Sequence, residues 1–396
     1  MTGQPLAAAI HSNVGLMHAS MAIYNAYCDR VPMLIIGATG PVDAARRRPW
    51  IDWIHTSGDQ GALIRQYSKW DDQPGSVEAA LNSLARAYAI TREAPSAPTY
   101  VCLDASLQEQ PLTATPPIPD VGRDRSPRSH GPDATAVAAA GELLDQARRP
   151  LFLLGRMSRD QQDWDRRVAL AERHGALVIS DLKTGAVFPS AHPLHPNAPS
   201  LFLAEALRDA LADQDQDASA CLVRLPLGWA GADLEVDHPL GYLGQDGGAG
   251  IGSGPGMAVG AALALEGSGR LPVAVLGDGD FLMGGTAIWT AAHYRLPLLI
   301  VVANNSFYYN DVVHQERVAG QRGRPAGNSW IGQALTDPDP DLGAFARSLG
   351  FQAGEQVRDR SALPAALAAA VAAARSGRCA LVDVRVRPDG YAAPGG

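Results

Sequence analysis

The sequence predicts an α/β protein built from doubly wound parallel sheets in three domains. Short apolar segments bounded by turn residues alternate with longer helical segments along its 396 residues, which is typical of buried parallel strands joined by helices. The 41 glycines and 29 prolines indicate many tight loops between these elements. Hydrophobic residues make up 46% of the chain and charged residues 19%, a globular composition in a chain long enough for two or three domains.

The first predicted domain covers residues 1–112 and is followed by a linker over residues 113–132. The linker is indicated because the segment from 111 to 132 is rich in Pro, Asp, Arg and Ser and has no apolar periodicity. The expected strands of this domain are residues 7–10, 33–36 and 99–103, and its expected helices are residues 18–28 and 77–91.

A second domain is predicted over residues 133–213 and a third over residues 218–390, with a polar stretch between them. At about 80 residues the second domain is small, and half a parallel sheet would expose apolar edges. Either this region is trimmed, or the sequence is an edited or decayed version of a longer one. The second domain is expected to contain helices 134–146, 161–174 and 201–211 with strands 151–154 and 177–180, and the third to contain strands 218–223, 273–276, 298–303 and 379–386 with helix 361–374.

Composition excludes several classes of protein. The net charge of −8 gives no support to nucleic-acid binding, and the basic run at residues 46–48 is interpreted as a solvated loop rather than a phosphate clamp. Four cysteines without CxxC spacing indicate neither a zinc site nor a disulfide framework. We expect no membrane span and no signal peptide, and therefore a cytoplasmic protein.

The strongest motif is Gly277-Asp278-Gly279, followed after 24 residues by Asn304-Asn305. Each half directly follows an apolar strand, and parallel strands in one sheet end at the same edge, where ligands of such sheets bind. A carboxylate and an amide oxygen there suit Mg²⁺, and the glycines would let a diphosphate approach the backbone. Alternatively, taken separately, the first half is a hairpin turn and the second a helix cap.

This motif resembles the thiamine-diphosphate (ThDP) binding motif. The three predicted domains are similar, in order, to the pyrimidine-binding, central and diphosphate-binding domains of the ThDP-dependent decarboxylase and acetolactate synthase superfamily. The first domain most resembles benzoylformate decarboxylase and its relatives, and the similarity lies in residues 10–41, 67–74 and 97–105. The resemblance therefore implies that the chain is truncated, relative to this family, at its N-terminus and in its central domain.

The resemblance assigns substrate contacts to His11 and Ser12. His11 would contact a 2-oxo acid or shuttle a proton, because an imidazole titrates in the useful range. The alternative is a loop histidine that caps a backbone carbonyl. The segment from 306 to 325 mixes aromatic, charged and glycine residues, so it is a candidate lid over the active site with His314 as its reactive group, although a solvated helix explains that segment nearly as well.

The glycine-rich loop over residues 247–256 lacks GxGxxG spacing, which argues against a nicotinamide site. In the family this loop runs beside the cofactor, which places Gly250, Ile251 and Gly252 there. Ile251 would be the apolar wedge that keeps ThDP folded for reaction, or else a core isoleucine. The remaining family assignments are Asp278, Asn305 and the backbone carbonyl of Phe307 as Mg²⁺ ligands, and Gly277, Gly279 and Asp280 beside the diphosphate.

One family residue is expected to be missing. ThDP enzymes need a glutamate that activates the aminopyrimidine ring, and in the family it precedes the segment matched by residues 2–5. Glu78, Glu93 and Glu109 do not take its place.

Two hypotheses follow from the resemblance. The first is a ThDP- and Mg²⁺-dependent decarboxylase or carboligase of a 2-oxo acid, at least a homodimer or homotetramer, with the glutamate supplied by a separate chain or by sequence ahead of residue 1. The second is a truncated homologue that binds Mg²⁺–ThDP as a non-catalytic or partner subunit. A Mg²⁺-nucleotide module is a weaker third hypothesis, because the sequence has no P-loop.

Overall fold

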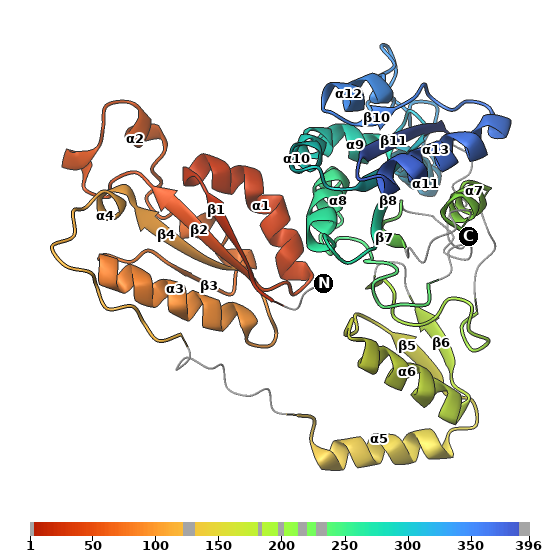
Figure 1. Ribbon diagram of the computed structural model, residues 1–396, viewed down its shortest axis with the longest axis horizontal. Helices are drawn as coiled ribbons and strands as arrows, with labels where there is room; N and C mark the ends of the chain where they lie inside the picture. Colours follow the sequence, from red (N-terminus) through yellow and green to blue (C-terminus); the bar gives the residue numbers. More distant parts are fainter. Residues whose placement is uncertain are drawn as a thin grey trace. The chain divides into compact units, whose positions relative to one another are not determined.

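The computed structural model describes residues 4–121, 131–180, 184–196, 202–212, 220–226 and 236–387. The chain packs as two compact units, an N-terminal unit of residues 2–140 with 246–250, and a C-terminal unit of residues 141–245 and 251–396 (Figure 1). Helix α5 (Ala134–Gln146) spans the boundary between them.

The N-terminal unit is built on a four-stranded parallel sheet of order β1-β2-β4-β3. Successive strand residues point to opposite faces, so that Ile35 and Tyr100 pack under α1 while Leu34 and Val101 pack under α3. The strands are β1 (Leu6–Ile10), β2 (Met33–Thr39), β3 (Trp70–Asp72) and β4 (Thr99–Asp104), and the helices are α1 (Ser12–Cys28), α2 (Ile51–Ile54), α3 (Val77–Arg92) and α4 (Ala105–Gln108).

The C-terminal unit holds a five-stranded parallel sheet of order β10-β11-β9-β8-β7 and a separate pair, β5-β6. Alternate residues of the central strands β8 and β9 enter two buried cores, one under α7 and α13 and the other under α8, α10 and α12. The strands are β5 (Leu151–Leu154), β6 (Leu177–Ser180), β7 (Ala220–Arg224), β8 (Leu271–Gly277), β9 (Leu298–Asn304), β10 (Gln352–Ala353) and β11 (Cys379–Arg385).

Local signals in the sequence set several helix ends of this unit. Asp160 accepts a hydrogen bond from the backbone N–H of Asp163 at the start of α6, and Gly175 closes that helix in the left-handed conformation. The helices are α6 (Gln161–His174), α7 (Phe202–Ala212), α8 (Ser253–Ala264), α9 (Asp278–Gly284), α10 (Ile288–Tyr294), α11 (Tyr309–Gln321), α12 (Leu342–Ser348) and α13 (Leu363–Arg375).

The predicted α/β class with parallel sheets is confirmed, and the structure corrects some boundaries. Helix α1 begins at Ser12 rather than residue 18, and the helix predicted from 361 starts as a short 3₁₀ turn, Arg360–Ala362. The short strands β3 and β10 were not predicted, because two or three residues carry no visible alternation.

Each predicted domain has its own sheet, but the second and third lie in one compact unit. The three domain boundaries remain predictions. Some of the predicted segments lie outside the described residues: residues 122–130 of the linker, residue 201 of a predicted helix, the polar stretch 213–217, residues 218–219 of a predicted strand and residues 388–390. Among the helices that the structure describes, none is both long and apolar enough to cross a bilayer.

Candidate cofactor site

The candidate site lies where β8 and β9 end. The two strands pair in parallel with Gly277 opposite Ala303, so Asp278 and the two asparagines leave the sheet at the same edge. A hairpin turn at the first half of the motif is therefore wrong. The asparagines are also not the cap of α11, whose N-cap residue is Tyr308.

Asp278 is the first residue of α9 rather than part of a turn ahead of it, and only 4% of it is exposed. Burial raises the pKa of its carboxyl to about 6, although backbone N–H groups of Gly279, Ser306 and Asn305 donate to it and oppose the rise. Its Oδ2 atom is buried without a hydrogen-bond partner in the described part of the chain. A buried carboxylate oxygen left in this state is suited to a bound cation.

The two asparagines turn their side chains onto the backbone that follows. The Oδ1 atom of Asn304 accepts from the backbone N–H of Ser306 at 3.1 Å, and that of Asn305 accepts from Phe307 at 2.9 Å. Ser306, which lies between Asn305 and Phe307, adopts a left-handed φ of 59°. These turns bring the amide oxygen of Asn305 and the backbone of Phe307 close together.

The donor set fits Mg²⁺. One carboxylate, one amide oxygen and one backbone carbonyl are hard ligands, and Mg²⁺ keeps further positions for water and phosphate. Among the described residues, no group of three or more His, Cys, Asp or Glu side chains is arranged to hold a metal ion.

Asp383 on β11 supports the asparagine turn and was missed by sequence reasoning. Its Oδ2 atom accepts from Asn304 Nδ2 at 3.4 Å and from Gln356 Nε2 at 3.0 Å. Burial raises the pKa of this carboxyl. The available signal was a lone acidic residue preceded by four apolar residues of the same strand.

The glycines of the motif have different surroundings. A Cβ atom on Gly279 would come within 2.2 Å of the ring of Tyr308, whereas a Cβ atom on Gly277 would meet nothing within 4 Å. The space beside Gly277 is therefore compatible with a diphosphate. Tyr308 is a second residue that sequence reasoning did not assign.

The glycine-rich loop leads into α8 through Gly252, which has a φ of 95°. Ile251 is 50% exposed, so the alternative of a core isoleucine is wrong. Gly250 lies in the part of the loop that packs with the N-terminal unit and donates to Asp246 Oδ2 at 3.1 Å. Asp280 turns its carboxylate toward the loop, where it accepts from the backbone N–H of Gly252 at 2.6 Å.

In the N-terminal unit, His11 and Ser12 lie where β1 gives way to α1. His11 is the N-cap residue, and its ring stands edge-on to that of His55 with 5.4 Å between centroids. Ser12 is buried with a φ of 53°, and its Oγ atom has no hydrogen-bond partner in the described part of the chain. Asn13 donates to the backbone carbonyl of Ile54 at 3.2 Å. His55 and Asn13 join the predicted pair as candidates.

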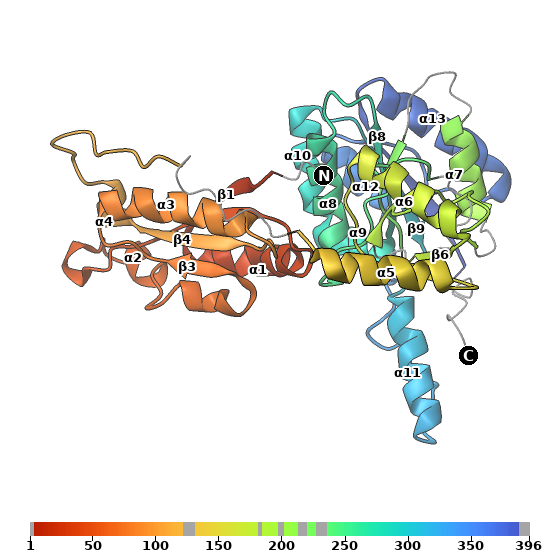
Figure 2. The ribbon, with the colours of Figure 1, turned by 90° about the horizontal axis from the view of Figure 1, so that it is seen from below.

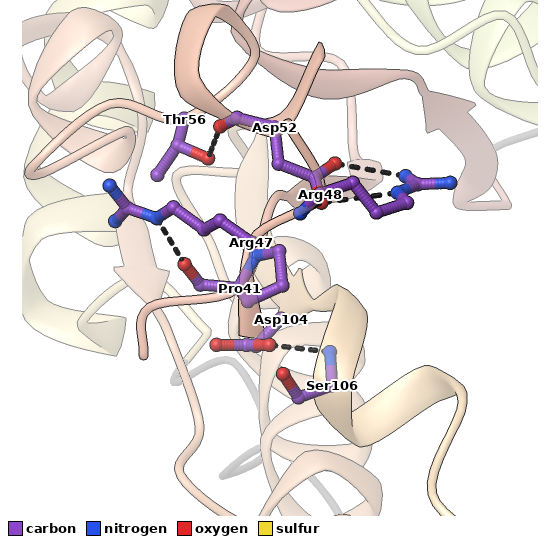
Figure 3. A network of polar contacts seen from close by, with 7 residues as sticks. All are labelled: Pro41, Arg47, Arg48, Asp52, Thr56, Asp104 and Ser106. Carbon is purple, nitrogen blue, oxygen red and sulfur yellow. Dashed lines mark hydrogen bonds and ion pairs between the residues drawn. The ribbon is translucent and has the colours of Figure 1, made fainter. Parts of the chain in front are cut away.

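The segment that carries His55 is held by a polar network (Figure 3). Arg48 binds the buried Asp52 through Nη2 at 2.9 Å and Nε at 3.1 Å, and Arg47 donates to the carbonyl of Pro41 at 2.7 Å. Asp104 accepts from the backbone N–H of Ser106 at 2.6 Å. The basic run thus has exposed ends, Arg46 and Arg48, and its side chains bind its own loop.

His314 is placed differently from the other predicted residues of the C-terminal unit. It is exposed in the middle of α11, which Figure 2 shows extending away from the body of that unit. Its reactive role remains a prediction, as do the roles of the other assigned side chains.

Comparison with known proteins gives the site a family context. Residues 227–384 match the family described as thiamine pyrophosphate enzyme, C-terminal TPP binding domain, where TPP is ThDP. The chain is 25% identical over 198 residues to a probable 2-ketoarginine decarboxylase of Pseudomonas aeruginosa. That match covers 50% of this chain and 34% of the relative. It is 31% identical over 159 residues to the acetolactate synthase large subunit of Parasynechococcus marenigrum. That match covers 40% of this chain and 24% of the relative. The chain thus spans about a third or less of the length of these relatives.

Solved structures of similar fold cover nearly the whole chain. The thiamine diphosphate-dependent 4-hydroxybenzoylformate decarboxylase of Rhodococcus jostii has a TM-score of 0.79 at 17% identity, over 98% of this chain and 88% of that one. Benzoylformate decarboxylase of Polynucleobacter necessarius has a TM-score of 0.80 at 18% identity, over 97% of this chain and 87% of that one. At these identities the likeness concerns the fold.

Proposed function

We propose that this chain, whose C-terminal domain belongs to the thiamine pyrophosphate enzyme family, binds ThDP with Mg²⁺ and acts on a 2-oxo acid as a decarboxylase or carboligase. The observation that carries the proposal is the buried Oδ2 atom of Asp278, which has no hydrogen-bond partner among the described residues and lies beside the Asn305 turn. Burying a carboxylate oxygen in this state is unfavourable, and a bound cation would offset that cost.

The chain's own residues would have separate tasks. Asp278, Asn305 and the carbonyl of Phe307 would hold Mg²⁺, and the open space at Gly277 would admit the diphosphate. Ile251, half-exposed, would press on the bound cofactor. His11 would hold or move a proton at the substrate, with Ser12 and His55 beside it. Bound ThDP supplies the electron sink that loss of carbon dioxide requires.

A second candidate is a Mg²⁺–ThDP binder without turnover. It is favoured by the placement of the three glutamates in the described part of the N-terminal unit. Glu78 lies in the first turn of α3, Glu93 follows that helix and Glu109 follows α4, and all three are exposed. Turnover would need the activating carboxylate from an additional segment or from a partner chain. We further propose at least a homodimer, as in the resembled family.

Titration calorimetry with ThDP, with Mg²⁺ present or removed by chelation, tests the binding part of the proposal. Saturable binding that requires Mg²⁺ is expected, and no binding would refute the cofactor assignment. Proton exchange at C2 of bound ThDP, followed by NMR, then separates the candidates. Exchange that is faster than for free ThDP supports the enzyme, and exchange at the free rate supports the non-catalytic binder.

A further inference from the structure

We propose that Asp280 and Arg224 are positioning residues that clamp the amino end of α8 against α9 and thereby fix the wall on which the cofactor lies. The proposal rests on the proposed ThDP binding. It concerns residues that lie outside the metal ligand set and assigns Asp280 a role other than direct contact with the diphosphate.

The two carboxylate oxygens of Asp280 have different partners. Oδ1 accepts from the backbone N–H groups of Gly252 at 2.6 Å and Gly254 at 3.3 Å. Oδ2 pairs with Nε of Arg224 at 3.1 Å, and the two side chains are 11% and 13% exposed. One carboxylate therefore satisfies both the loop backbone and a largely buried guanidinium.

Arg224 extends the clamp to a third element. It is the last residue of β7, and its Nη1 atom donates to Ser253 Oγ at 3.3 Å and lies 3.6 Å from the sulfur of Met257. Strand β7, the start of α8 and the start of α9 thus meet at one ion pair.

The backbones at this junction are in direct contact. A Cβ atom on Gly284 would come within 2.1 Å of the carbonyl oxygen of Gly252, and one on Gly254 would come within 2.2 Å of Asp280 Oδ2. Neither glycine leaves room for the loop to shift toward α9. The clamp therefore defines the position of the loop rather than merely tethering it.

This geometry couples the two ends of the proposed cofactor site. Asp280 lies two residues after the proposed metal ligand Asp278, and Gly252 directly follows the proposed wedge Ile251. Buried ion pairs contribute little net stability, so a positional role is the better explanation for this pair. Arg224 also balances the charge of Asp280, which would otherwise repel an incoming diphosphate.

The variants Asp280→Asn and Arg224→Met test the clamp through two measurements on the full chain. The first is the Kd for ThDP in saturating Mg²⁺, which we expect to rise at least about 10-fold, as for loss of a buried charged hydrogen bond. The second is amide hydrogen exchange of Gly252 and Gly254 without cofactor, which should become faster. Arg224→Lys keeps the charge, so compared with Arg224→Met it should restore most of the affinity for ThDP and most of the protection of the two amides from exchange. Arg166→Met, which breaks an exposed pair with Asp163 at 3.4 Å, should change neither.

The outcomes separate the clamp from the proposed function. If the unaltered chain binds ThDP and Asp280→Asn binds equally well with unchanged exchange, the clamp is refuted while the function stands. If the unaltered chain does not bind ThDP, the proposed function and the cofactor role of the clamp both fail. Slow amide exchange of Gly252 and Gly254 would then show only that the ion pair stabilises the local structure. Should Asp280→Asn fail to fold, Arg224→Lys against Arg224→Met decides by the same two measurements.

Discussion

The ring of Tyr308 lies against the α-carbon of Gly279, where a methyl group would come within 2.2 Å of ring atom Cε1. Tyr308 follows the asparagine turn and Gly279 follows the acidic residue of the first half of the motif, so this contact packs the two halves together. The two halves also interact electrostatically. Burial raises the pKa of the Tyr308 hydroxyl, and the charge of Asp278 raises it further.

The first prediction is that Gly279→Ala destabilises the protein by about 1–3 kcal/mol, because the added methyl group overpacks the site. Removing the ring in the double variant Gly279→Ala with Tyr308→Ala should recover most of that loss. Denaturant unfolding of the two single variants and the double variant measures the coupling. A Gly279→Ala protein as stable as the unaltered one would contradict the contact.

Gly277→Ala is the matched comparison and the second prediction. Gly277 has a φ of −76°, which alanine adopts readily, and its added Cβ atom would meet nothing within 4 Å. We therefore expect unchanged unfolding stability but a Kd for Mg²⁺–ThDP raised at least about 10-fold, roughly 1.4 kcal/mol of binding free energy. Unchanged binding would place the diphosphate elsewhere.

Much of this edge could be predicted from the sequence. Each half of the motif follows an apolar strand, and two such strands in one parallel sheet end at the same edge. The sequence therefore predicted that Asp278 and the asparagines lie close together. The contacts of Asp280 could not be predicted in this way. They depend on Arg224 and Gly252, which lie 56 and 28 residues earlier in the chain, and no local pattern relates them.

The N-terminal unit shows the same limit. His11 and Ser12 were assigned by resemblance, yet α1 begins six residues earlier than its apolar pattern indicated, which makes His11 a cap residue. His55 was missed because its loop has no regular period, and its place is set by Asn13 and by the network around Asp52. Loop positions of this kind follow from tertiary contacts rather than from local sequence.

The third prediction concerns Asp278→Asn. The substitution removes the anionic ligand, so Mg²⁺-dependent ThDP binding should fall at least about 100-fold, roughly 2.7 kcal/mol. Without cofactor the variant should be no less stable, because the carboxylate is buried with an oxygen that has no partner in the described residues. Calorimetry with and without a chelator measures the first effect, and denaturant unfolding the second. Binding that keeps its full Mg²⁺ dependence would refute the ligand assignment.

A fourth prediction follows from the Arg48–Asp52 pair. Hydrogen bonds from Arg48 hold the pKa of the Asp52 carboxyl below its usual range. A depressed pKa stabilises the fold above the pKa of the unfolded chain, and this contribution is lost as the pH falls through the folded value. Asp52→Asn should therefore lower the unfolding midpoint at pH 7. The difference should shrink as the pH falls below roughly 3.9, where the unfolded carboxyl titrates, and it should vanish once the pH is below the lowered pKa of the folded state.

Thermal unfolding at several pH values checks this, with Arg46→Met as the control. Arg46 pairs with Asp43 at 3.7 Å, and both side chains are more than half exposed, so its removal should have little effect at any pH. A difference between Asp52→Asn and the unaltered chain that persists unchanged at low pH would show that the pair acts through packing rather than charge.

The last prediction separates cofactor binding from substrate chemistry. His11→Ala should leave the Kd for Mg²⁺–ThDP within about twofold, because the proposed ligands of the metal and diphosphate all lie in the C-terminal unit. In protein that turns over a 2-oxo acid, the same variant should lose about 10²–10⁴-fold in kcat, the usual contribution of a positioned acid or base. His18→Ala, on an exposed position of the same helix, should preserve both values. Equal losses in the two variants would remove His11 from the reaction and leave it as the N-cap residue of α1.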